Sequence, residues 1–209
     1  MTREAWIELN DKYLRNNKDR SMAGEISKIE LNLEELSRTE LDFHVNMAAV
    51  GKCTCVLNDT GLTADVRTYT PDYESIMISI VDAAMQYECP YTGTIHILII
   101  RNALHVISME NNLIPPFIIR EAGIELNDTP KIQIDDPDVE YHSVYFKETK
   151  FRIPLSLWGT FSNFSSTKTI VEFLNECEKI HVLRPTVWNP HSSPYAKMRK
   201  VCFTGKDKF

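Results

Sequence analysis

Residues 95–106 read IHILIIRNALHV, and residues 95–100 form the most apolar run of the chain. Ile and Val are enriched in β-strands, so this run predicts the strongest strand of the protein. It is too short to cross a bilayer, which takes about 18–20 apolar residues. Residues 89–93, with Pro and Gly among them, predict a turn just before it.

The sequence upstream of this run predicts further strands joined by turns. Residues 53–57 carry Cys, Cys and Leu at every second position, and residues 63–70 resume an alternating pattern. Asn, Asp, Thr and Gly at 58–61 predict the turn of a hairpin between them. Residues 76–84 are rich in Ile and Val and predict the next strand. We therefore expect a small, mainly antiparallel β-barrel or sandwich over residues 41–110.

Helices are expected on both sides of this β region. Apolar residues recur at helical spacing in residues 2–18 and 168–180, and both segments have narrow apolar faces. Residues 117–122 predict a short helix after two prolines. In residues 21–40 the helical and the alternating pattern compete. Strands are expected at 144–146 and 152–157, and poor order is expected from residue 185 onward.

These elements predict a mainly β protein with flanking helices, in the α+β class, divided into three parts. Residues 1–38 are expected to be a helical N-terminal segment, and residues 39–130 the β domain. Residues 131–209 are expected to be a C-terminal extension with short strands, one helix and a disordered tail.

Composition excludes several functions. The chain has 209 residues and a net charge of −6, so we expect no direct binding to nucleic acid and none to anionic membranes. Five cysteines, an odd number, and a polar N-terminus without a signal sequence favour an intracellular, cytoplasmic protein. The histidines are scattered, and Cys53 and Cys55 have no second pair at zinc-binding spacing. We therefore expect neither a metal nor another cofactor.

Three stretches occur in an order that is similar to one protein family. Residues 39–51 read TELDFHVNMAAVG, residues 99–106 read IIRNALHV, and residues 111–114 read NNLI. Together they resemble the retropepsin-like aspartic protease region of copia-type long-terminal-repeat retroelement polyproteins. The resemblance covers roughly residues 39–125 and places Asp42 at the position of the family's catalytic aspartate.

This resemblance implies a small closed β-barrel core and a catalytic homodimer. One Asp42 from each chain would lie at the two-fold axis, and the two carboxylates would share one proton. The ionised carboxylate would activate a water molecule against the peptide bond of a polyprotein substrate, and the protonated one would donate to its carbonyl oxygen. The turn at 88–93 is expected to be the flap over the substrate.

The loop after Asp42 departs from the family pattern. Phe43 stands where active members have Ser or Thr, and Val45 stands where they have Ala. His44 agrees with a subgroup of such elements that reads Asp-Ser-His-Ala. The family's hydroxyl bonds across the dimer, and a phenyl ring can neither donate nor accept that bond.

A second aspartate, Asp59, is the alternative to Asp42. Residues 59–61 spell Asp-Thr-Gly, which is the literal aspartic protease triplet. The residues that follow it are too polar for the family pattern, and the distance to residues 95–106 is short. An Asn-Asp-Thr-Gly sequence is also an ordinary turn. Asp42 is therefore the preferred catalytic residue and Asp59 the alternative.

Three functions follow from the sequence. The first is an aspartic endopeptidase that cleaves the polyprotein containing it. The second is an inactive retroelement remnant that keeps the fold, which Phe43 and Val45 favour. The third is an unrelated acidic interaction domain.

Overall fold

The computed structural model describes residues 37–66 and 74–183, and within them the protein is mainly β with two short α-helices, as the sequence predicts. The described elements follow in chain order. They are β1 (Ser37–Leu41), β2 (Ala49–Val50), β3 (Cys55–Val66), β4 (Ile76–Glu88), β5 (Ile95–His105), β6 (Asn112–Ile114), α2 (Pro116–Glu121), β7 (Glu125–Asp128), a 3₁₀ turn η1 (Lys131–Gln133), β8 (His142–Phe146), β9 (Phe151–Pro154), β10 (Ser156–Trp158), β11 (Phe161–Lys168), α3 (Val171–Glu176) and β12 (Ile180–Val182).

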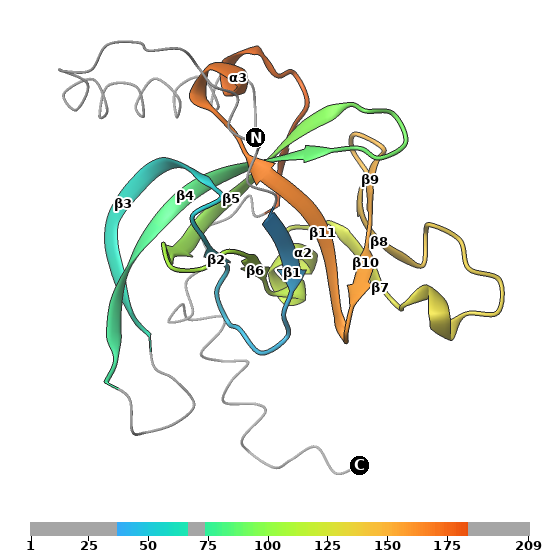
Figure 1. Ribbon diagram of the computed structural model, residues 1–209, viewed down its shortest axis with the longest axis horizontal. Helices are drawn as coiled ribbons and strands as arrows, with labels where there is room; N and C mark the ends of the chain where they lie inside the picture. Colours follow the sequence, from blue (N-terminus) through green and yellow to red (C-terminus); the bar gives the residue numbers. More distant parts are fainter. Residues whose placement is uncertain (1–36, 67–73, 184–209) are drawn as a thin grey trace.

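Most described strands belong to one nine-stranded sheet, which is shown in Figure 1. Its order is β10-β11-β1-β6-β2-β5-β4-β3, and β12 pairs with β5. Pairing is mainly antiparallel, as predicted, but β1–β6, β2–β5 and β5–β12 are parallel. Because β11 pairs with both β1 and β4, neighbouring strands lead from β11 through β1, β6, β2, β5 and β4 back to β11.

The run at 95–100 forms the first half of β5, and side chains on both of its faces are buried. Leu98 and Ile100 point into the main core, whereas Ile97 and Ile99 pack with Leu174 of α3 in a second cluster. Coverage of both faces explains why this strand is continuously apolar instead of alternating.

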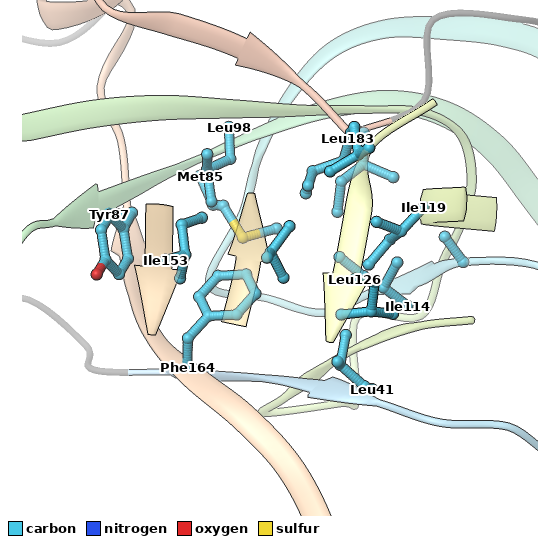
Figure 2. Packing of buried hydrophobic residues seen from close by; sticks show 14 of the residues in the cluster. Leu41, Met85, Tyr87, Leu98, Ile114, Ile119, Leu126, Ile153, Phe164 and Leu183 are labelled. Carbon is cyan, nitrogen blue, oxygen red and sulfur yellow. The ribbon is translucent and has the colours of Figure 1, made fainter. Parts of the chain in front are cut away.

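A three-stranded sheet, β7-β8-β9, packs on the large one. Its residues Leu126 and Ile153 share one cluster with Met85, Leu98 and Phe164 of the large sheet (Figure 2). The larger core therefore lies between the two sheets. The division predicted at residue 131 does not coincide with a boundary between sheets, because β7 precedes it while β8, β9, β11 and β12 follow it.

Two local predictions are wrong. Residues 58–61 are not a hairpin turn: they lie within the 12-residue strand β3, where the pairing with β4 shifts register between Asp59 and Leu62. The helix predicted at 168–180 is only the six-residue α3, because β11 extends to Lys168 and β12 begins at Ile180.

Further predictions concern segments outside residues 41–110, and their outcomes differ. The short helix after the two prolines is confirmed as α2, with Pro at its start. Strands are also confirmed at the sites predicted beyond residue 140. Residues 37 and 38, expected at the end of a helical segment, belong to β1. The helix predicted at 2–18 and the tail from 185 lie outside the described residues.

Candidate functional site

The loop that carries Asp42 spans residues 42–48 and joins β1 to β2. These strands are not neighbours, because β6 lies between them and pairs with both. The backbone N–H of Asp42 donates to the carbonyl of Ile114 at the end of β6, at 3.2 Å. At the other end of the loop, the carbonyl of Ala48 accepts from the N–H of Leu104 at 2.8 Å. Both ends of the loop are thus fixed by backbone bonds to neighbouring strands.

The Asp42 carboxylate is held within its own loop. Its Oδ1 accepts from the backbone N–H of His44 at 2.8 Å, and the Nδ1 of His44 lies 3.4 Å from the same oxygen. The Asp42 side chain is 18% exposed, so it is partly covered yet reachable from solvent. A ligand approaching from solvent can therefore reach this carboxylate.

The residues that follow Asp42 project from the surface. Phe43 is 65% exposed and the His44 side chain 77%, while Val45 is half-buried. Phe43 is thus a largely exposed ring that follows a partly covered carboxylate in the chain. The structure therefore brings Asp42, Phe43 and His44 together at one surface.

A buried polar network joins the strands on either side of this loop. The Oδ1 of Asn112 accepts from the N–H of Gly51 at 2.9 Å, and its Nδ2 donates to the hydroxyl of Thr39 at 3.3 Å. The Thr39 hydroxyl also lies 2.9 Å from that of Ser166. Asn112, Thr39 and Ser166 are almost fully buried, so the network ties β1, β6 and β11 to the chain just after β2.

Sequence reasoning missed the role of Asn112. Residues 111 and 112 match a turn, yet Asn112 begins strand β6 and is fully buried. Its partners are 61 and 73 residues away in the chain, so no local pattern indicates them. The only available signal was the family resemblance of residues 111–114.

Gly51 lets the chain just after β2 lie very close to the backbone of Met109. A Cβ at this position would overlap the backbone carbonyl of Met109, and the neighbouring N–H of Lys52 donates to that same carbonyl at 3.1 Å. Only glycine allows the two backbones to approach this closely.

Asp59 lies in a different environment. It is exposed on β3, and its Oδ1 accepts from the N–H of Gly61 at 2.9 Å. Gly61 adopts a φ of +72°, which fits the irregular pairing at this point of the ribbon. The structure does not bring Asp59 into the loop of Asp42.

The turn between β4 and β5 is not placed to cover Asp42. Its bonds are regular, with the N–H of Gly93 donating to the carbonyl of Cys89 at 2.8 Å. Figure 1 shows this turn at the upper right, whereas the loop between β1 and β2 lies at the lower centre. The expectation that residues 88–93 form a flap over Asp42 is therefore wrong.

Within residues 37–66 and 74–183, no group of three or more His, Cys, Asp or Glu side chains is arranged to hold a metal ion. No helix of that same part is long and apolar enough to span a membrane. Comparison with known proteins gives no relative: no family model, no curated protein and no solved structure matches the chain.

Proposed function

We propose that this chain is a retroelement-derived, retropepsin-like aspartic endopeptidase that acts as a homodimer, with Asp42 as the catalytic residue of each copy. The observation that carries the proposal is the Asp42 loop. It presents a reachable carboxylate from a short loop whose two ends are fixed to neighbouring strands. Fixed geometry is what a catalytic carboxylate needs, since a displacement of about 1 Å can cost on the order of 10²-fold in rate.

The strand pairing supports the same proposal. The ring of pairings from β11 through β4 and back is what a closed β core requires. Such a core is rigid because each strand in the ring has a partner on both sides. Asp42 extends from the end of β1, which is one strand of that ring.

The proposed reaction needs two copies of the loop. Two Asp42 carboxylates a few ångströms apart cannot both ionise, so they share one proton. The ionised carboxylate takes a proton from water, and the resulting nucleophile attacks the peptide carbonyl carbon. The protonated carboxyl group donates a hydrogen bond to the carbonyl oxygen as charge develops on it. Collapse of the tetrahedral intermediate then breaks the C–N bond, and the amine leaves with the proton that the first carboxylate took from water.

The exposed ring of Phe43 favours a second candidate, which is an inactive remnant that keeps the fold. Two phenyl rings would lie beside the two carboxylates in the dimer, where the family has hydroxyl groups. In such a dimer the rings would stand between the chains and could provide no cross-dimer hydrogen bond. For the first candidate, the enzyme, the same ring predicts weak activity in the natural chain and higher activity after Phe43→Ser.

A peptide-library cleavage assay tests both candidates. The chain is incubated at acidic and at neutral pH, with and without a transition-state isostere. Asp42→Asn should abolish cleavage, Phe43→Ser should raise it, and the matched control Asp59→Asn should leave it unchanged. Loss of cleavage in Asp59→Asn but not in Asp42→Asn would refute the assignment.

Sedimentation of the same variants separates the two candidates. A dimer without cleavage, in both the natural chain and Phe43→Ser, would identify the inactive remnant. A strict monomer without cleavage would contradict both the dimeric enzyme and a dimerising remnant.

A further inference from the structure

Three buried histidines lie where the three-stranded sheet meets the large sheet. His96 belongs to β5 and His181 to β12, and these two strands are neighbours in the large sheet. His142 belongs to β8 of the small sheet. They are 8%, 5% and 2% exposed, which is unusual for a side chain that titrates near neutral pH.

His96 and His181 bond to each other. The Nδ1 of His96 lies 3.0 Å from the Nε2 of His181. One ring must donate and the other accept, so at least one of the two nitrogens has to be unprotonated. The second nitrogen of His181, Nδ1, lies 3.3 Å from the hydroxyl of Thr149 in the turn between β8 and β9. The pair is thereby linked to the small sheet.

One phenyl ring of the small sheet stacks on this pair, and a second lies tilted beside His181. Phe151 of β9 lies 3.8 Å from His96 and 4.3 Å from His181 between ring centroids, with interplanar angles of 13° and 25°. Phe146 of β8 lies 4.9 Å from His181. Placing a second positive charge in this stack would remove the bond between the two histidines and add repulsion between two buried cations.

A second contact between the sheets uses the third histidine. The Nε2 of His142 lies 2.8 Å from the hydroxyl of Ser162 on β11, and both residues are buried. The hydroxyl can serve a neutral or a charged ring, but burial disfavours the charged one.

The surrounding charges also oppose protonation of the pair. Burial and, second to it, the positive charge of Lys179 together lower the pKa of His96 to about 4. Burial lowers the pKa of His181 to about 4, with His96 as the second cause. Tyr87 of β4, whose ring is 6.4 Å from that of His96, stays neutral because burial raises its pKa.

For His142 the neighbouring charges act in opposite directions. Burial lowers the pKa of His142, Lys131 of η1 lowers it further, and Asp128 of β7 raises it.

We propose that the neutral forms of these histidines hold the β7–β9 sheet on the large sheet, and that acid increases the fraction of molecules in which the small sheet has separated as a unit. This device does not depend on Asp42 or on the proposed protease activity. It would couple the exposure of the core between the sheets to the pH of the surroundings.

The direction of the pH dependence follows from the lowered pKa values. A histidine in the separated state regains a pKa near 6.5, whereas in the docked state His96 and His181 titrate at about 4. Docking is therefore most favourable above about pH 6.5 and weakens as the pH falls toward 4. In that window the opening constant rises by up to about tenfold per pH unit for each histidine that takes up a proton.

Hydrogen exchange of the full chain, read by mass spectrometry, tests the proposal. Exchange is measured from pH 7.5 to 4.5 and corrected for the intrinsic rate at each pH. Peptides from residues 125–154 should lose protection steeply below pH 6.5, while peptides from β3 and β4 remain protected. Parallel loss in both regions, or no loss in either, would overturn the proposal.

The double variant His96→Gln, His181→Gln removes both titrating rings of the pair. In this variant, the equilibrium constant for opening of residues 125–154 should rise less steeply as the pH falls. The rise per pH unit should be smaller by a factor of up to about 10². His105→Gln is the matched control, because His105 is a second histidine of β5, half-buried and outside the pair, whose pKa burial also lowers. An unchanged slope in the double variant, or an equal loss of slope in His105→Gln, would contradict the mechanism.

A direct titration of the histidines in the natural chain tests the proposal even if the double variant does not fold. Ring-proton NMR of the natural chain should show two coupled histidines that titrate well below pH 6. If all histidines titrate near pH 6.5 while residues 125–154 stay protected, the device does not exist.

Discussion

Asp42 and Asp59 have the same local geometry and opposite surroundings. Each carboxylate accepts the backbone N–H of the residue two positions later, at 2.8 Å for Asp42 and 2.9 Å for Asp59. Asp42 follows β1, a strand paired on both sides, and its loop returns to the sheet at β2. Asp59 is exposed in the middle of β3, the outermost strand in the order of the large sheet.

The comparison shows that the same bond between a carboxylate and a nearby backbone N–H occurs in two different structural settings. The literal Asp-Thr-Gly triplet at 59–61 lies on an outer strand, where the hydroxyl of Thr60 donates to the carbonyl of Ile80 at 2.6 Å, whereas the altered motif at Asp42 lies next to the buried network of Asn112 and Gly51. A catalytic group needs support from residues distant in sequence, because local hydrogen bonds alone do not fix its position. The following predictions test whether that support differs as the structure indicates.

The largest effect is expected from Gly51→Ala. The added methyl group would overlap the backbone carbonyl of Met109, so the chain after β2 must move. We expect a loss of about 3 kcal/mol or more in the free energy of unfolding, measured by urea denaturation. Gly61→Ala is the control: its methyl group meets nothing, and only the φ of +72° is strained, for about 1 kcal/mol. Equal losses would mean that the two regions do not differ in packing.

Asn112→Ala should rank second. It leaves the buried N–H of Gly51 and the hydroxyl of Thr39 without this partner, and it opens a space in the core. We expect a loss of about 2–3 kcal/mol in thermal or urea unfolding. Asn111→Ala, which removes only a partly buried bond to Glu40, should cost about 1 kcal/mol or less. A neutral Asn112→Ala would show that the network does not support the Asp42 loop.

Asp42→Ala should cost more stability than Asp59→Ala. The first variant removes the acceptor of the His44 N–H in a partly covered loop, so we expect a loss of about 1 kcal/mol. The second removes an acceptor from an exposed strand and should stay within about 0.5 kcal/mol. Parallel urea titrations of both proteins measure the difference. The reverse order would indicate that the structural support lies at Asp59.

Phe43→Ser should have the smallest effect on stability. The ring is 65% exposed, so its removal should change the free energy of unfolding by no more than about 0.5 kcal/mol. Together with the increased cleavage expected under the proposed function, this result would show that Phe43 restrains activity without serving the fold. A large loss of stability would instead assign Phe43 a packing role.

Sequence patterns predicted the elements whose cause is local. The apolar run at 95–100 indicated β5, and two prolines followed by Gly123 indicated α2. The same reasoning failed at residues 58–61, because Asn, Asp and Gly suit a β-bulge as well as a turn. It also extended α3 too far, since apolar residues at 177 and 180 match helical spacing while packing against β5.

The sequence by itself determined that the protein is mainly β and that Asp42 lies where a polar segment meets an apolar one. Only the tertiary structure decided which distant residues meet there. Thr39 and Ser166 are 127 residues apart, and His96 and His181 are 85 apart, yet each pair is in hydrogen-bonding contact. Alternating apolar residues and turn-forming residues influence only a few neighbouring positions, so they indicate local strands and turns. Strand pairing and burial depend on the whole chain, and they decide which polar groups become buried partners.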